Sequence, residues 1–323
     1  MKIATLTLAT ICGLLLCGSA HAAITRIAYS AISGSMTVLW VTQEQGLFKR
    51  QGLDTQLLYI GGGTVVTQAL IGGDVQFVRL GAAAVIQASL RGAELKMISN
   101  TVNTLIFSLI AKPEIRSPQE LKGKKIGLTR IGGSTDFALD LVLNKAGLRK
   151  GPDVAVIQTG GMPQLLGALS AGAVDAGVFS PPTSILALKM GMRELVDFAD
   201  TGITYAASPV ATTESILSKQ RDLAVRFVRA YSEGIHRVTT DPEGTMKVVA
   251  KYTKEKDPAV LTELYRIYGV KHLDKIPYVK SDAVEAILRS EVKGAENSKP
   301  SEFIDNTLVS GLEQEGLFHK LYP

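Results

Sequence analysis

Two parts of the chain resemble each other at a constant offset of 99 residues. Ile27-Ala28-Tyr29-Ser30 is similar to Ile126-Gly127-Leu128-Thr129, and Gly34-Ser35 matches Gly133-Ser134. A second block keeps this offset and pairs Gly61-Gly62 with Gly160-Gly161, Ala69-Leu70 with Ala168-Leu169, Gly73 with Gly172 and Val75 with Val174. Glycine turns recur throughout α/β proteins, so a single match would carry little weight. Two blocks at one offset predict two similar α/β lobes with a cleft between them.

The second copy shows what each lobe contains. In residues 124–148 a short apolar run ends at the turn 132–135, and an apolar helical pattern follows at once. We expect a strand, a glycine turn and a helix, with Ser134 or Thr135 as the N-cap and Asp136 in the first turn. The start of such a helix has unpaired N–H groups and a partial positive charge, which suit the oxygen atoms of a small ligand. The same pattern also fits a capped helix that binds nothing.

The first lobe is expected to alternate strands and helices in the same way. Strands are predicted at residues 24–29, 57–60, 75–80, 96–99 and 107–111, and helices at residues 36–49, 64–70 and 85–90. The second of these strands ends at three glycines, which let the backbone approach a ligand closely, and Thr64 would cap the helix that follows. Trp40, the only tryptophan, fits the core better than a ligand platform, although both interpretations remain open.

The order of these elements predicts that the first lobe is discontinuous. Prolines mark the passage into a second lobe at residues 113–204, which lies between lobe-one segments at residues 23–112 and 205–323. A strand at residues 206–211 would return to lobe one, and the helical chain that follows would pack on that lobe. In lobe two a strand stops at Ser180-Pro181-Pro182, where two prolines fix a loop at the carboxyl end of the strand. That loop either borders a ligand or is only a rigid turn.

Residues 1–22 have the pattern of a cleavable signal peptide. A basic residue precedes an apolar run at residues 3–17, and Ala20-His21-Ala22 is a small-x-small cleavage site. This run is too short to span a bilayer as a helix. A lipid anchor at Cys17 is the alternative, but Leu16 stands where a lipoprotein signal would have a small residue. Both cysteines lie in this segment, so the exported chain would have no disulfide and no thiol chemistry.

Charge and histidine spacing argue against several other classes of protein. The 35 basic and 30 acidic residues are scattered, and no basic stretch is interleaved with aromatic residues, so we expect no nucleic-acid partner. His236, His272 and His319 remain after processing, and none has a metal-ligating residue three or four positions further on. We therefore expect no metal, no cofactor and no Ser-His-Asp triad.

Four stretches of the sequence carry a resemblance to a known family. They are LWVTQEQGLFKRQGLD, IGGGTVVTQALIGGDVQF, LKGKKIGLTRIGGSTDF and GALSAGAVDAGVFSPP. The chain resembles the nitrate/sulfonate/taurine class of solute-binding proteins of ABC importers, which includes the thiamine-precursor-synthase-like (NMT1/THI5-like) domain, over residues 26–320. The resemblance implies two Rossmann-like lobes joined by two crossing strands, the periplasmic binding protein type II-like fold. It also implies a periplasmic monomer that traps a small molecule and passes it to an inner-membrane permease.

The resemblance further implies which residues contact the ligand. Carried over position by position, the family's contacts fall on Ser33, Gly34, Ser35, Met36, Gly62, Gly63, Thr64, Leu80, Gly81, Ala82, Gly132, Gly133, Ser134, Thr135, Asp136, Gly161, Met162, Ser180 and Pro181. We expect the lobes to hinge near residues 111–113 and 205–208, because binding proteins of this kind close on their ligand.

Two arginines suggest that the ligand is an anion. Arg79 and Arg130 lie at the carboxyl ends of predicted strands, where they would face the cleft. A guanidinium beside helix N–H groups suits the oxygens of a sulfonate, nitrate or carboxylate. Alternatively, either arginine points to solvent or pairs with a nearby acid, for which Asp136 is a ready partner of Arg130.

Two other functions remain open beside solute capture. The family's enzymatic branch, a thiamine-pyrimidine synthase, relies on a cysteine-rich motif and an active-site histidine. The mature chain has neither, so we do not expect an enzyme. A receptor that reports its bound ligand to a membrane signalling partner would need the same closed surface as an importer's binding protein. The sequence does not separate these two roles, and it does not identify the ligand.

Overall fold

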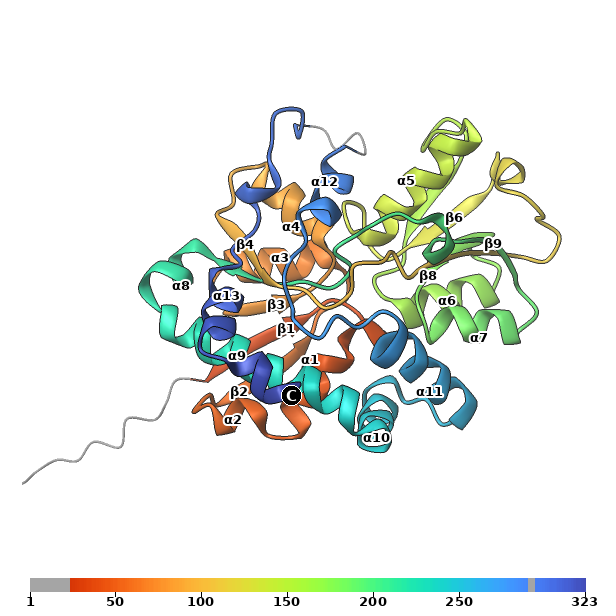
Figure 1. The fold of residues 1–323 in the computed structure, drawn as a ribbon. Helices are drawn as coiled ribbons and strands as arrows, with labels where there is room; N and C mark the ends of the chain where they lie inside the picture. The colour runs from red at the N-terminus through yellow and green to blue at the C-terminus, as the bar shows by residue number, and fades with distance from the viewer. Residues whose placement is uncertain (1–23, 290–293) are drawn as a thin grey trace, which may run out of the picture.

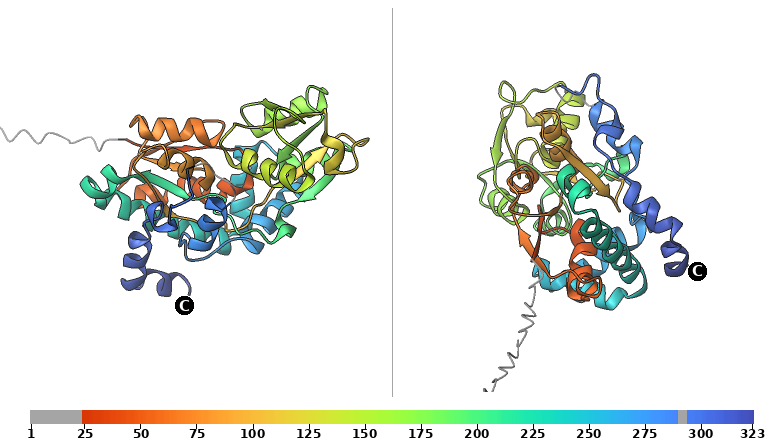
Figure 2. Two further views of the ribbon diagram at one scale, coloured as in Figure 1. Left: turned by 90° about the horizontal axis from the view of Figure 1, so that it is seen from above. Right: turned by 90° about the vertical axis from the view of Figure 1, so that its left-hand side faces the viewer.

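A computed structural model describes residues 24–289 and 294–323 of the chain. The expected signal peptide at residues 1–22 lies outside these described residues. The described chain forms two α/β lobes that lie side by side, each with one five-stranded sheet and helices packed on it (Figure 1, Figure 2). In this part of the chain, no helix combines the length and the apolar character that are needed to cross a membrane.

The two sheets have the same topology. The first contains β1 (Thr25–Tyr29), β2 (Thr55–Tyr59), β3 (Phe77–Arg79), β4 (Leu95–Ser99) and β10 (Val210–Thr213), in the order β2-β1-β3-β10-β4. The second contains β5 (Ser108–Ala111), β6 (Lys125–Leu128), β7 (Ala155–Gln158), β8 (Ala176–Phe179) and β9 (Arg193–Asp197), in the order β7-β6-β8-β5-β9. In each sheet the first three strands run parallel, and the fourth pairs antiparallel with both neighbours. The prediction of two similar α/β lobes is confirmed.

Helices connect the strands within each lobe. The first lobe contains η1 (Gly34–Met36), α1 (Thr37–Glu44), α2 (Leu47–Arg50), α3 (Gly63–Ile71) and α4 (Ala82–Ser89). The second contains η2 (Pro118–Leu121), α5 (Ser134–Ala146), α6 (Met162–Ser170), α7 (Thr183–Lys189) and η3 (Ala199–Thr201). The bounds of α3 and α6 differ by 99 residues at both ends, as the repeat predicts. The single helix expected at residues 36–49 was wrong, because Gly46 adopts a left-handed φ of 65° and separates α1 from α2.

The chain after β10 is mostly helical and packs on the first sheet. It forms α8 (Glu214–Lys219), α9 (Arg221–Thr240), α10 (Pro242–Thr253), α11 (Pro258–Tyr265), the π-helical turn η4 (Arg266–Lys271), α12 (Ser281–Leu288), η5 (Pro300–Glu302), α13 (Thr307–Gln314) and α14 (Leu317–Leu321). Helix α9 packs against α1 and α2, and Phe227 stacks on Phe77 of β3 with ring centres 4.2 Å apart. Trp40 is fully buried and stacks on Tyr252, which confirms its place in the core. The helical region expected on lobe one is therefore present.

The chain passes between the lobes along two segments that pair with each other. Thr104 and Thr204 form an antiparallel bridge, and Ala207 N donates a hydrogen bond to Val102 O at 2.9 Å. The strand that we expected at residues 107–111 of lobe one lies in the second sheet as β5, because its backbone pairs with β8 and β9. The first crossing therefore comes before β5 rather than after it.

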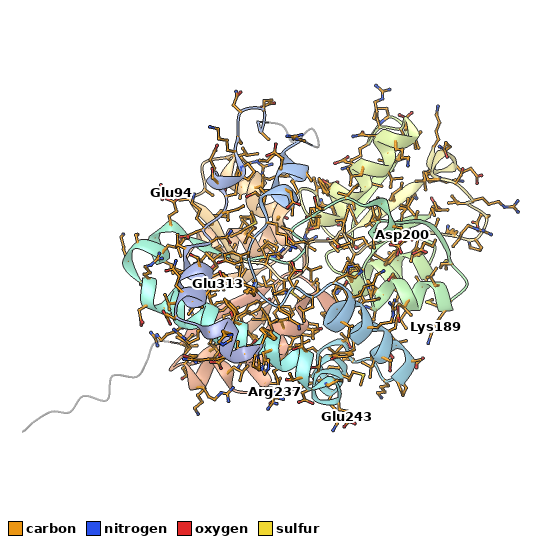
Figure 3. All side chains as sticks on the ribbon, viewed as in Figure 1. Glu94, Lys189, Asp200, Arg237, Glu243 and Glu313 are labelled. Carbon is orange, nitrogen blue, oxygen red and sulfur yellow. The ribbon has the colours of Figure 1, made fainter. Side chains whose placement is uncertain are left out.

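Charged side chains are spread over the outside of both lobes. The residues labelled in Figure 3 are all exposed and come from distant elements: Glu94, Lys189, Asp200, Arg237, Glu243 and Glu313. Among the arginines and lysines that the structure describes, only Arg79 is buried. The surface charge is thus scattered, while one cation lies inside lobe one.

Candidate ligand-binding site

The two lobes enclose a small cavity where the carboxyl ends of their parallel strands face each other. It is lined by Ser30, Ala31, Ser33, Ser35, Met36, Gly62, Gly63, Gly81, Ile106, Phe107, Thr129, Ser134, Thr135, Met162, Ser180, Ala207 and Tyr268. The volume open to the centre of a water-sized sphere is about 50 Å³. One buried water needs roughly 10–15 Å³ on this measure. In this arrangement the cavity has room for a compact ligand of a few heavy atoms.

Three helices begin at the wall of the cavity. Gly63 starts α3, Ser134 starts α5 and Met162 starts α6, and all three residues line the cavity. Each helix follows a glycine, which has no side chain that could cap it. Within the described residues, the backbone N–H groups of Gly63, Ser134, Thr135 and Met162 have no hydrogen-bond partner. Helices of both lobes therefore present free donors and partial positive charge to the cavity.

The N-caps that we predicted for α5 were wrong. Gly133 is the N-cap, and Ser134 and Thr135 are the first two residues of the helix. Their hydroxyl groups bond elsewhere: Thr135 Oγ1 accepts from Thr129 N at 3.2 Å, and Ser134 Oγ accepts from Tyr205 Oη at 2.7 Å. Because these side chains do not cap the helix, the N–H groups at its start are left for another acceptor.

Thr64 does not cap α3 either. The N-cap is Gly62, whose φ of 92° and ψ of 132° suit glycine better than any residue with a side chain. Thr64 lies in the first turn, and a Cβ atom added to Gly132 would lie 3.3 Å from its methyl group. Thr64 thus packs against the glycine turn of the opposite lobe.

The side chains at the cavity wall are hydroxylic or apolar. None of the lining residues found in the described chain is His, Cys, Lys, Arg, Asp or Glu. Ser180 is only 3% exposed, and its Oγ atom has no hydrogen-bond partner. A buried hydroxyl without a partner is costly, so Ser180 is suited to bond a ligand. No cluster of His, Cys, Asp and Glu that could hold a metal occurs in residues 24–289 or 294–323.

Half of the residues that we expected at the ligand line this cavity. They are Ser33, Ser35, Met36, Gly62, Gly63, Gly81, Ser134, Thr135, Met162 and Ser180. The others lie outside the lining: Gly34, Thr64, Leu80, Ala82, Arg130, Gly132, Gly133, Asp136, Gly161 and Pro181. Leu80 and Ala82 belong to the core of lobe one, directly behind the wall. Contact between any of these residues and a ligand stays a prediction.

Direct hydrogen bonds hold the lobes closed over the cavity. Pro181 O of lobe two accepts from Gly34 N and from Ser33 Oγ of lobe one, each at 3.1 Å. The loop with two prolines therefore contacts the opposite lobe. On the returning crossing segment, Tyr205 donates to Ser134 of lobe two. Burial raises the pKa of Tyr205 to about 12, so its hydroxyl remains a donor at neutral pH.

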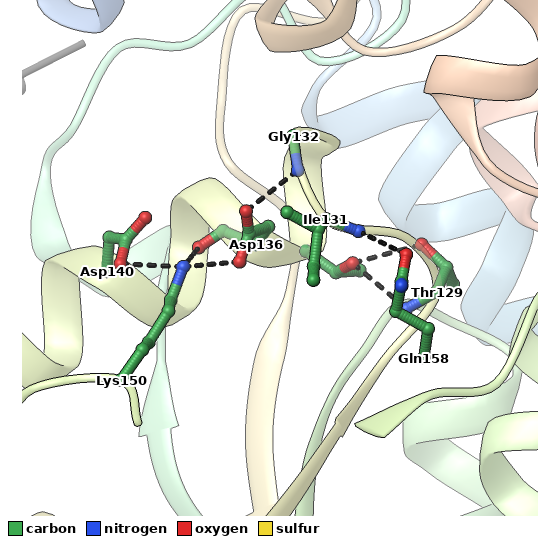
Figure 4. Close-up of polar contacts among 8 residues, drawn as sticks. Thr129, Ile131, Gly132, Asp136, Asp140, Lys150 and Gln158 are labelled. Atoms are coloured by element: carbon green, nitrogen blue, oxygen red, sulfur yellow. Dashed lines mark hydrogen bonds and ion pairs between the residues drawn. The ribbon is translucent and has the colours of Figure 1, made fainter. Parts of the chain in front are cut away.

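Asp136 is held within lobe two and does not line the cavity. Its carboxylate accepts a hydrogen bond from Gly132 N at 2.8 Å and pairs with Lys150, which also contacts Asp140 at 2.7 Å (Figure 4). The suggested pairing of Asp136 with Arg130 is therefore wrong, because Lys150 occupies that place.

Arg130 lies across the seam between the lobes, at the outer edge of the site. A Cβ atom added to Gly62 of lobe one would lie 2.2 Å from Arg130 Cγ. Burial raises the pKa of Tyr59, and the positive charge of Arg130 partly opposes this rise. Arg130 thus covers the seam beside the first glycine turn and is not among the residues that line the cavity.

Arg79 lies behind the cavity wall, inside lobe one. Its guanidinium donates two hydrogen bonds to Ser35 O, from Nε at 3.0 Å and from Nη2 at 2.7 Å. Burial lowers the pKa of Arg79 to about 9, which leaves it mostly charged at neutral pH. We expected Arg79 to face the cleft, but Ser35 stands between its guanidinium and the cavity.

Sequence reasoning missed several lining residues: Ser30, Ala31, Ile106, Phe107, Thr129, Ala207 and Tyr268. Tyr268 comes from η4, in the region that was expected only to cover lobe one. A Cβ atom added to Gly34 would lie 2.2 Å from its ring, and burial raises the pKa of its hydroxyl. No motif marks Tyr268. Thr129, in contrast, directly follows β6 and could have been found from its place at a strand end.

A comparison with models of known protein families identifies the family of this chain. The NMT1/THI5 like family model matches residues 34–245, more than half of the sequence. The chain belongs to the NMT1/THI5-like family. The matched range contains all helix starts at the cavity and ends before Tyr268.

Relatives and solved structures resemble this family member over most of its length. A relative from Brucella abortus (strain 2308), provisionally named a binding protein, is 29% identical over 74% of this chain and 74% of its own. The alkanesulfonate-binding protein SsuA from Xanthomonas axonopodis pv. citri, solved with bound MOPS, has a TM-score of 0.69 and 19% identity, and covers 82% of this chain and 90% of its own. The periplasmic nitrate-binding protein NrtA from Synechocystis PCC 6803 has a TM-score of 0.74 and 11% identity, and the match covers 94% of this chain and 91% of NrtA.

These structural matches establish the fold. This NMT1/THI5-like protein has the periplasmic binding protein fold of SsuA and NrtA. The resemblance that we drew from four sequence stretches is confirmed at the level of family and fold. The names of SsuA and NrtA state what those two proteins bind, and the shared fold does not assign the same ligands to this chain.

Proposed function

We propose that this protein captures a small anion between its two lobes and delivers it to the permease of an ABC importer. One observation carries the proposal: free helix N–H groups at Gly63, Ser134, Thr135 and Met162 converge on a cavity between the lobes that no acidic side chain lines within the described residues. Backbone donors at helix starts favour negative charge, and a carboxylate on the wall would oppose it. The hydroxyl of Ser180 adds a donor without a partner.

The comparisons support the class of ligand and the transport role. SsuA is named for alkanesulfonates, and NrtA is named as a periplasmic nitrate-binding protein. A further structure with this fold, from Staphylococcus aureus, is named as the ligand-binding component of an ABC-type import system. A sulfonate, nitrate or small carboxylate fits the size of the cavity and its donors. We further propose that residues 1–22 are removed on export, that the mature protein works in the periplasm as a monomer, and that it binds no nucleic acid.

We infer that the protein is not an enzyme. A serine or threonine hydroxyl becomes an effective nucleophile only beside a general base such as His, Lys, Asp or Glu, and acid–base catalysis needs a titratable side chain near the substrate. The described part of the cavity wall offers only hydroxyl groups, backbone groups and apolar side chains. Incubation with pyridoxal phosphate and analysis by mass spectrometry should yield no product.

The lobe boundaries and hinges are part of the same proposal. We place lobe two at residues 113–204 together with the preceding strand β5, because β5 belongs to the second sheet. Hinge motion would then fall in the paired crossing segments near residues 102–107 and 204–208, and not at residues 111–113. Hydrogen exchange of these segments with and without ligand would test this placement.

Thermal unfolding with a panel of solutes tests the proposed ligand class. The panel contains nitrate, methanesulfonate, acetate and methylphosphonate, and glycerol and dimethyl sulfone serve as uncharged controls. A ligand at one hundred times its dissociation constant should stabilise the protein by about 2.7 kcal/mol. Stabilisation by uncharged solutes alone would contradict the proposal.

A further inference from the structure

Arg79 connects the ligand cavity to both crossing segments. It lies at the end of β3 and is only 1% exposed. Its two hydrogen bonds to Ser35 O turn that carbonyl group toward the interior of lobe one. Ser35 itself lines the cavity from the turn η1. The carbonyl that would repel an anion is thereby engaged by a cation.

The same guanidinium bonds to the places where the chain enters and leaves lobe one. Arg79 Nη2 donates to Thr101 Oγ1 at 3.1 Å and to Ser208 Oγ at 3.0 Å. Thr101 directly precedes the first crossing segment, and Ser208 is the last residue of the returning one. The guanidinium carbon also lies 5.1 Å from the ring centre of Tyr231 on α9. Arg79 is therefore held by contacts within lobe one and by hydrogen bonds to residues at both crossing segments.

The charge of Arg79 has no counter-ion in the described chain. None of the ion pairs that the structure contains involves Arg79, and its Nη1 atom has no hydrogen-bond partner. Desolvation alone lowers its pKa, with no acidic group acting against it. A buried charge without a counter-ion is disfavoured even where it is hydrogen-bonded. Hydrogen bonds to Ser35, Thr101 and Ser208 compensate this cost only in part, because they supply no negative charge, and Arg79 lies directly behind the wall of the cavity.

We infer that Arg79 is a positioning residue that makes the cavity selective for anions without touching the ligand. It fixes the Ser35 turn with the carbonyl directed away from the cavity. Its positive charge is separated from the cavity by Ser35 alone. The bound anion is then the missing counter-charge. This inference rests on the proposed function and assigns its charge preference to one side chain.

Two substitutions separate a charge effect from a purely structural one. Arg79→Gln removes the charge, and Arg79→Lys keeps it while losing the two-pronged guanidinium geometry. Isothermal titration with the anion that binds wild type most tightly, among nitrate, methanesulfonate, acetate and methylphosphonate, should show at least about tenfold weaker binding to R79Q. R79K should recover most of this loss. Arg229→Gln, which removes a partly exposed arginine that pairs with Glu315 on lobe one, is the matched control and should bind like wild type.

Each result either supports the inference or overturns it. R79Q with unchanged affinity, or R79K as weak as R79Q, would overturn it and leave the proposed function intact. A wild-type protein that binds none of the four anions would contradict the proposed function and the inference with it. If R79Q fails to fold, the Nε–Hε resonance of Arg79 in wild type replaces it. That resonance should shift when the anion saturates the site, and an unchanged resonance would overturn the inference.

Discussion

Replacing Gly81 by alanine should weaken ligand binding by preventing closure of the lobes. Gly81 precedes α4 with φ of −77° and ψ of 145°, a conformation that alanine adopts without strain. A Cβ atom at this position would lie 1.7 Å from Ser134 Oγ of lobe two and 3.0 Å from Tyr205 Oη. The added methyl group therefore conflicts with the closed lobes, while the backbone of lobe one has no difficulty accommodating it.

The size of the effect follows from the contacts that must change. Ser134 Oγ has to move away, which breaks its 2.7 Å hydrogen bond with Tyr205. A hydrogen bond contributes about 0.5–1.5 kcal/mol, and overpacking a close contact costs about 1–3 kcal/mol. The closed, ligand-bound form of G81A should lose about 1.5–4.5 kcal/mol. Affinity should then fall by about tenfold at least, and by about a thousandfold if both costs are near their upper limits.

Calorimetry and X-ray scattering together test this reasoning. Calorimetry with the best anion gives the affinity, and scattering at saturating anion gives the radius of gyration, which should stay at the ligand-free value in G81A. Gly167→Ala on α6 is the matched control, because a Cβ atom there meets nothing within 4 Å. Ser134→Ala in the G81A background should restore part of the affinity. The reasoning is refuted if G81A binds and closes like wild type.

Three further predictions concern stability and processing. Phe227→Ala should lower the free energy of unfolding by about 3–5 kcal/mol, because the buried ring stacks on the first sheet, and urea unfolding measures this. Burial would raise the pKa of Asp175, but hydrogen bonds from Lys112 and from the backbone lower it overall, so this carboxylate stabilises the fold above its unfolded pKa. Unfolding between about pH 5 and pH 2 should show that contribution disappear on acidification, and Asp175→Asn should not show it. N-terminal sequencing after export should give Ala23, whereas a lipid on Cys17 would contradict the assigned cleavage site.

The repeat predicted more of the fold than any single motif did. Matching residues at one offset were enough to predict two lobes, and Gly73 and Gly172, which correspond, both have a positive φ, of 80° and 72°. The sequence did not show that β5 belongs to lobe two. A strand that joins the second sheet has the same apolar pattern as a strand that remains in the first. The true start of α5 was missed because serine and threonine are common N-cap residues and both follow Gly133 directly. In the structure Ser134 Oγ instead accepts a hydrogen bond from Tyr205, and Gly133 is the N-cap.

The site was predicted only where it follows strand ends. The glycine turn at residues 61–63 could be located, so Gly63 was expected near the ligand and does line the cavity, whereas Met162 was expected there only from the family resemblance. The direction of Arg79 could not be inferred, because alternate residues of a strand face opposite sides and the sequence did not show which side faces the cleft. Tyr268 reaches the cavity from a helix far along the chain, and that contact depends on tertiary packing alone.

A crystal structure with the best-binding anion tests the central claim most directly. The account predicts that the oxygens of the anion lie about 3 Å from the backbone nitrogens of Gly63, Ser134, Thr135 and Met162. It also predicts that Arg79 still bonds Ser35 O and makes no contact with the ligand. An anion that is bound outside this cavity, or held by a guanidinium while the four N–H groups face water, would contradict it.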